Sequence, residues 1–113
     1  MTLDAGQIVL LPFPHTNLKS GKKRPSLVLT DSRYNAKSSD VVLAFVTPQK
    51  QTGKWSVGIA SDDLATGQLV KDSWVRVDRL ATVEQRLVKG VVGQLEPDML
   101  KRVQSLLVAL LGD

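Results

Sequence analysis

Four side chains in this sequence carry groups suited to acid–base or phosphate chemistry. Arg24 precedes Pro25 at the start of an apolar run, and Thr47 closes a run of β-forming residues. Arg76 and Asp78 lie two apart in an alternating segment, so both would project from one face of a strand. A guanidinium can bind phosphate in two places, a hydroxyl can donate to it, and a carboxylate can accept a proton. Together these groups are typical of a site that acts on a phosphate ester.

Each of these residues also has a simpler interpretation. A lone arginine before a strand is more often solvated, and a threonine at a strand end is often only a β-branched residue beside a turn. An arginine and an aspartate two apart are more often an exposed ion pair. Taken singly, none of the four identifies a site.

Positive charge is concentrated near the N-terminus. Fifteen Lys and Arg residues against eleven Asp and Glu residues give a net charge of +4, which favours an anionic partner. No acidic residue occurs between Asp4 and Asp31. A local positive field of this kind attracts phosphate. The candidate contacts are the single histidine and five lysines: His15, Lys19, Lys22, Lys23, Lys50 and Lys54.

Several function classes are excluded by what the sequence lacks. There is no cysteine, so disulfides, thiolate metal sites and a cysteine nucleophile are ruled out. One histidine alone does not suggest a metal site, and no glycine-rich phosphate loop is present. We therefore expect no cofactor and no metal. No apolar run approaches the ~20 residues of a membrane span, and we expect a cytoplasmic protein.

The hydrophobic pattern predicts one mainly β domain covering residues 1–113. Apolar or alternating runs predict strands near 8–11, 26–30, 41–47, 56–59, 73–80 and 88–95. A basic loop is expected between the first two, and turns are expected near 31–35 and 62–68. Gly90 and Gly93 indicate a bent or bulged last strand.

A single amphipathic helix is predicted at the C-terminus. Pro97 suits its first turn, Asp98 suits its positive end, and leucines recur at helical spacing before Gly112. Its apolar stripe could serve either the core or a second copy of the chain. Short strands followed by one helix favour an antiparallel barrel or half-barrel with the helix laid on it.

In combination, the segments resemble the PemK/MazF-like toxins along nearly the whole chain. The strongest part is Lys23-Arg24-Pro25-Ser26-Leu27-Val28, and Asp72-Ser73-Trp74-Val75-Arg76 also fits. The run Gly6–Pro14, the strand ending at Thr47 and the closing Leu95–Asp98 follow the same order. The chain departs from the usual pattern at Gln7, Pro48 and Ala81, where relatives often have an acid, a serine and an arginine.

The resemblance implies an SH3-like antiparallel barrel, a homodimer, and sequence-selective, metal-independent cutting of single-stranded RNA. The products would be a 2′,3′-cyclic phosphate and a 5′-OH, formed by attack of the ribose 2′-OH. By carry-over, Arg24 would stabilise the reacting phosphate and Thr47 would hold it. Arg76 and Asp78 would serve as an acid–base pair. The lysines and His15 named above would bind RNA.

The resemblance also implies a cognate antitoxin with an acidic tail, and an indirect contact with DNA through the toxin–antitoxin complex. Two alternatives stay open at this point. A barrel of this kind can be a non-catalytic RNA- or protein-binding module. Toxins of the same fold can also act on DNA gyrase, although the Arg24-Pro25 motif and the basic loop favour RNA.

Overall fold

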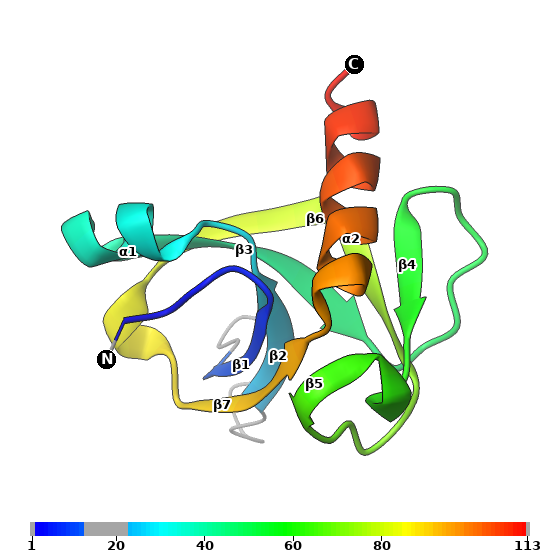
Figure 1. The fold of residues 1–113 in the computed structure, drawn as a ribbon, viewed down its shortest axis with the longest axis horizontal. Coiled ribbons are helices and arrows are strands. Elements are labelled where there is room, and N and C mark those ends of the chain that lie inside the picture. Colours follow the sequence, from blue (N-terminus) through cyan, green and yellow to red (C-terminus); the bar gives the residue numbers. More distant parts are fainter. Residues whose placement is uncertain (1, 13–22, 113) are drawn as a thin grey trace.

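The computed structural model describes residues 2–12 and 23–112, and the fold is drawn in Figure 1. The elements in this part of the chain are β1 (Gln7–Pro12), β2 (Lys23–Val28), α1 (Ser32–Lys37), β3 (Asp40–Thr47), β4 (Ser56–Ile59), η1 (Ser61–Asp63), β5 (Leu64–Gly67), β6 (Ser73–Glu84), η2 (Gln85–Leu87), β7 (Gly90–Leu95) and α2 (Pro97–Leu110).

The strands form one antiparallel sheet in the order β4-β6-β3-β2-β1-β7-β5. The sheet curls into a half-barrel, and α2 rises from it with its C-terminal end projecting beyond the strands (Figure 1). This arrangement confirms the predicted mainly β fold with a C-terminal helix. The long central strand β6 pairs with both β3 and the edge strand β4, so residues distant in sequence share one surface.

Each face of the curled sheet has its own apolar cluster. One face carries Ile8, Leu27, Val46 and Val75, which pack with Val103 of α2. The opposite face carries a second, smaller cluster: Leu3, Val9, Leu11, Val28, Val41 and Leu43. Strand residues therefore alternate between two buried environments, which explains why β1 and β3 read as almost continuous apolar runs.

The leucine stripe of α2 serves mainly the core. Met99, Leu100, Leu106, Leu107 and Leu110 are partly buried against the α2-facing cluster. At the free end of the helix two apolar side chains stay exposed, Val108 at 45% and Leu111 at 74%. No helix in the described part of the chain is both long and apolar enough to cross a bilayer.

Two elements differ from the sequence-based expectation. Residues 31–35 were expected to form a turn, but Asp31 caps a short helix, α1, by accepting hydrogen bonds from the backbone N–H groups of Arg33 and Tyr34. The expectation of a single helix was therefore wrong. Residues 62–68 were expected to form a turn-rich segment, but their second half is β5, which pairs with β7.

The pairing of β5 with β7 depends on two glycines. Gly67 has a φ of +84°, and a Cβ there would collide with the carbonyl oxygen of Val92. A Cβ on Gly93 would lie 2.5 Å from the carbonyl oxygen of Thr66. Only glycine permits this backbone conformation and this close approach. The register between β1 and β7 also shifts here, as expected for a bulged last strand.

A buried amide network joins α1 to the sheet. The Asn35 amide donates to the carbonyl oxygens of Leu3 and Thr30, at 2.8 Å each. The Gln85 amide meets three carbonyl oxygens, those of Asn35, Ser38 and Asp40, at 2.8–3.0 Å. These side chains satisfy backbone groups that no strand partner reaches, so they fix α1 against β3 and the end of β6.

Candidate functional site

The four candidate residues lie on one face of the sheet, the face that α2 does not cover. Pairing partners in an antiparallel ladder point to the same side, and Thr47 pairs with Trp74 while Phe45 pairs with Arg76. The intervening Val46 and Val75 are buried in the α2-facing cluster. Thr47 and Arg76 therefore project from the opposite surface.

Arg24 reaches the same surface from β2. Arg24 pairs with Leu11 of β1, and Leu11 belongs to the apolar cluster on the face opposite α2, so the Arg24 side chain points to the same face as Thr47. Arg24 is exposed, and the expected basic loop gives way to β2 already at Lys23. The arginine thus stands on a strand, which restricts its backbone more than a loop would.

The hydroxyl of Thr47 is partly engaged by its own turn. Its Oγ1 accepts a hydrogen bond from the backbone N–H of Gln49 at 3.1 Å. This is the local turn chemistry that a threonine before Pro48 favours. Because a hydroxyl has one hydrogen and two lone pairs, the accepted bond leaves the Thr47 proton available to a ligand oxygen.

Arg76 and Asp78 form a two-point ion pair. Nε of Arg76 donates to Oδ1 of Asp78 at 3.2 Å, and Nη2 donates to Oδ2 at 2.9 Å. The hydrogen bond from Arg76, supported by its charge, lowers the pKa of Asp78 below its usual value. About a third of each side chain is exposed, so the pair is open to solvent and to a ligand. The simpler interpretation of an ion pair is confirmed, and it leaves the carboxylate ionised and ready to accept a proton.

A bulge in β6 opens the sheet beside this pair. Ala44 pairs with Leu80 but Phe45 pairs with Arg76, so residues 77–79 have no partner on β3. Next to the bulge is a pocket of about 60 Å³ lined by Gln51, Gly53, Trp55, Ser56, Arg76 and Asp78. At roughly 30 Å³ per water, it has room for about two oxygen-sized groups.

Sequence reasoning missed several neighbours of this pair. Trp74 lies half-buried between Thr47 and Gly58 on the adjoining strands. A Cβ on Gly58 would lie 3.3 Å from the Trp74 indole nitrogen, so the glycine leaves space for the ring. Trp55 and Ser56 line the small pocket although they were interpreted as a loop and a plain strand. The Trp-x-Arg-x-Asp alternation was the one available signal for Trp74.

The structure describes three of the six residues that were predicted to bind RNA. Lys23, Lys50 and Lys54 are exposed, and none of them forms an ion pair with another residue in 2–12 or 23–112. The ammonium of Lys54 sits 4.8 Å from the centre of the Trp55 ring. His15, Lys19 and Lys22 lie outside the described residues. Within 2–12 and 23–112, no three acidic or histidine side chains gather as metal ligands would.

The sequence of this chain also matches a known protein family. Residues 4–111 match the model of the PemK-like, MazF-like toxins of type II toxin–antitoxin systems. The chain belongs to this toxin family. A curated relative in the family, from Mycolicibacterium smegmatis, is named a probable endoribonuclease MazF. It is 34% identical over 92 residues, which cover 80% of this chain and 83% of the relative.

Solved structures show the same fold. A chain of the MazE–MazF complex from Deinococcus radiodurans superposes with a TM-score of 0.79 at 24% identity, covering 99% of this chain and 97% of its own. An endoribonuclease from a mycobacterial species, solved with its cognate antitoxin, gives 0.76 at 21% identity, with 97% and 95% covered. The MazF-like fold therefore extends over the whole described chain.

Proposed function

We propose that this protein is the toxin of a type II toxin–antitoxin pair and a sequence-selective endoribonuclease that cuts single-stranded RNA. The supporting observation is that the sheet face away from α2 carries Arg24, Thr47 and the Arg76–Asp78 pair. Guanidinium and hydroxyl groups bind a phosphodiester, and the ionised carboxylate supplies a base without a metal.

The reaction proposed is attack of a ribose 2′-oxygen on the adjacent phosphorus. Asp78 takes the 2′-OH proton, the new O–P bond forms, and the bond from phosphorus to the 5′ oxygen breaks. The products are a 2′,3′-cyclic phosphate and a 5′-OH, whose proton comes from the contacting guanidinium or from water. Arg24 and Thr47 stabilise the charge that builds on the phosphate oxygens. Arg76 holds the Asp78 carboxylate in place.

The decisive experiment is cleavage of a long single-stranded RNA in excess EDTA by the parent protein, Arg24→Ala and Arg33→Ala. Removing one group that stabilises transition-state charge costs roughly 10²–10³ in rate, and we expect that loss for Arg24→Ala. Arg33 is a matched control because it is an exposed arginine on α1, outside the site. Mapping the products should show discrete 5′-OH ends.

Other outcomes would contradict the proposal in distinct ways. Intact RNA with the parent protein would favour a non-catalytic RNA- or protein-binding module, or action on DNA gyrase. Cleavage that Arg24→Ala retains in full would remove Arg24 from the reaction. Thr47→Val, which keeps the shape but loses the hydroxyl, should slow cutting, whereas Thr47→Ser should not.

We also propose a cognate antitoxin whose acidic segment binds the exposed cations around the site, with DNA reached only through the complex. The supporting observation is that Lys23, Arg24, Lys50 and Lys54 are exposed without acidic partners in the described chain. RNA and antitoxin would be met in the cytoplasm. Co-expression with the antitoxin should restore growth that the toxin alone arrests. Continued arrest with an antitoxin that binds the toxin would contradict this assignment.

A further inference from the structure

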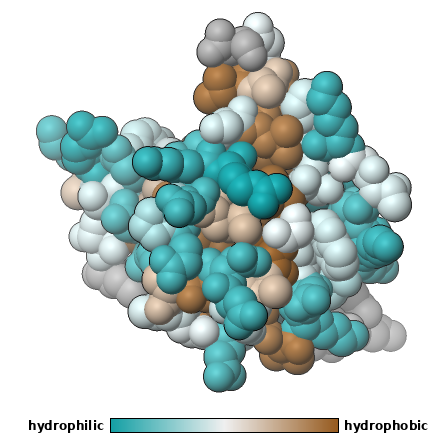
Figure 2. Space-filling model, turned by 45° about the vertical axis from the view of Figure 1, so that its right-hand side comes forward, coloured by the Kyte–Doolittle hydropathy of each residue, from teal (hydrophilic) through white to brown (hydrophobic). Residues whose placement is uncertain are grey.

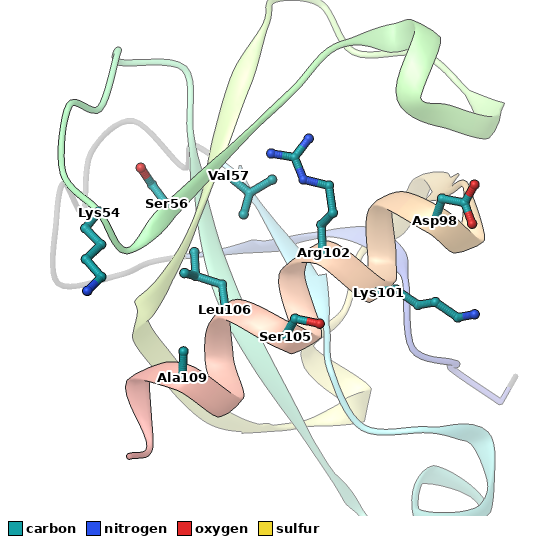
Figure 3. A pocket seen from close by; sticks show the side chains of 9 residues that line it. All are labelled: Lys54, Ser56, Val57, Asp98, Lys101, Arg102, Ser105, Leu106 and Ala109. Carbon is teal, nitrogen blue, oxygen red and sulfur yellow. The ribbon is translucent and has the colours of Figure 1, made fainter. Parts of the chain in front are cut away.

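A groove separates α2 from the edge strand β4, on the side of the sheet away from Arg24 and Thr47. Its volume is about 550 Å³. Figure 3 shows Arg102 and Leu106 directed from the helix toward β4, while Lys54 stands at the far rim. Nine residues line it: Lys54, Ser56, Val57, Asp98, Lys101, Arg102, Ser105, Leu106 and Ala109.

The chemistry of this lining favours a polyanion with apolar parts. It brings together three cations, Lys54, Lys101 and Arg102, against one carboxylate, Asp98. All three cations are exposed, and none forms an ion pair within residues 2–12 and 23–112. Two serine hydroxyls and a small apolar floor complete the groove. A positively charged groove that follows the phosphates supplies the sequence-independent part of binding to a single nucleic-acid strand.

The groove continues directly from the candidate reaction site. Ser56 lines both the groove and the small pocket that holds Arg76 and Asp78, and it is the register partner of Arg76. Lys54 also stands at this junction, with its ammonium held over the Trp55 ring that lines the small pocket. A chain that leaves the small pocket past Ser56 therefore enters the groove.

We propose that the groove between β4 and α2 binds the single-stranded RNA that continues on one side of the cut. This inference rests on the proposed function, because an endonuclease cuts within a chain and its substrate must extend away from the site. Arg102 and Lys54 bind successive phosphates, and Leu106 contacts the apolar face of the intervening nucleotide. The groove thereby adds affinity for long RNA.

The first test measures binding to 2′-O-methylated single-stranded RNA, which lacks the attacking hydroxyl and is not cut. The variant is Lys54→Ala/Arg102→Ala. The control, Arg33→Ala/Lys37→Ala, removes the same two side-chain types from α1, which lies on the opposite side of the molecule from α2 and β4 (Figure 1). Two lost phosphate contacts should reduce the slope of log Kd against log salt by about 1.4, at about 0.7 each, for a long strand. The control should keep the parent slope.

The second test locates the RNA along the groove. Because the chain has no cysteine, Ser105→Cys provides a single site for a photoreactive label on the exposed face of α2. Crosslinks should map to one side of the cut in a long RNA that carries a single 2′-deoxy nucleotide at the cut position. The same label at Ala36→Cys on α1 gives the background.

The outcomes separate this inference from the proposed reaction. An unchanged salt slope in the double variant, or crosslinks no stronger than from α1, would overturn the groove assignment even if the protein cuts RNA. The groove assignment would also be overturned if an acidic peptide bound the groove and the double variant bound RNA as well as the parent protein does. If the parent protein cuts no RNA but binds 2′-O-methyl RNA through the groove residues, the groove assignment is supported and the proposed reaction is refuted.

Discussion

At the scale of the residue, the Arg76–Asp78 pair has the clearest functional consequence. Asp78 must be ionised to accept a proton, and the hydrogen bond from Arg76 lowers its pKa. In the folded protein the carboxylate therefore stays ionised to a lower pH than in the unfolded chain. The stabilising contribution of the pair is present above the ordinary aspartate pKa and is lost as the pH falls through the lowered value.

Removing the arginine should be visible in the pH dependence of cleavage. In Arg76→Ala the pKa of Asp78 returns toward its usual value, so the acid limb of kcat/KM should move to higher pH. Arg86→Ala is a matched control, because Arg86 pairs with Glu84 at the same two-residue spacing at the end of β6. An acid limb that stays in place in Arg76→Ala would mean that Asp78 is not the base.

The alternation along 73–80 predicted that Trp74, Arg76 and Asp78 share a face, but not which residues of the neighbouring strand lie beside them. Alternation along one strand is a local property, and the structure agrees with it. Trp74 lies beside Gly58 because β4 pairs with β6. This pairing joins residues that are far apart in the sequence. No local pattern indicates such a pairing, so the neighbours that β4 contributes to the site could not be found from the sequence.

At the scale of the element, the strands with strong apolar character were predicted and the short polar elements were not. The run that forms β3 is rich in β-branched and aromatic residues, which favour a half-buried sheet surface. By contrast β5 has only four residues, three of them exposed. Its existence depends on the close approach of Gly67 and Gly93, which is a tertiary feature.

Substitution of Gly67 tests this account of β5. In Gly67→Ala the new Cβ meets the Val92 carbonyl oxygen and the positive φ becomes strained, so we expect a loss of about 3 kcal/mol in the free energy of unfolding. Gly90→Ala is the control, since a Cβ there meets nothing within 4 Å, and its change should stay within about 0.5 kcal/mol. Urea denaturation gives both values, and equal stabilities would refute the close-approach argument.

At the scale of the whole molecule, we propose that the projecting end of α2 contacts a second copy of the chain. The resemblance implies a homodimer, and Figure 2 shows apolar side chains exposed where the C-terminal end of the helix leaves the barrel. Val108 and Leu111 are the exposed members. Exposed apolar surface of this kind is often part of an interface.

We expect the parent protein to sediment as a dimer at micromolar concentration and Val108→Glu/Leu111→Glu to sediment as a monomer. Burying two carboxylates in an apolar contact without partners is costly, so the dimer should dissociate. Gln104→Glu/Lys101→Glu, on the exposed surface of the same helix, changes charge without altering the apolar end. A parent protein that sediments as a monomer would contradict the dimer.

The amide network around Gln85 makes the fold sensitive to chemical change at one side chain. One NH₂ group with two hydrogens serves three carbonyl oxygens, so its loss cannot be covered by a neighbour. Spontaneous deamidation, which Gln85→Glu reproduces, would set a carboxylate against those oxygens and raise its folded-state pKa. The aged form should therefore melt at lower temperature at neutral pH and recover below the pKa of an ordinary glutamate, where a protonated carboxyl donates again. Thermal melts of Gln85→Glu across pH test this, and a melting temperature equal to the parent's at neutral pH would contradict it.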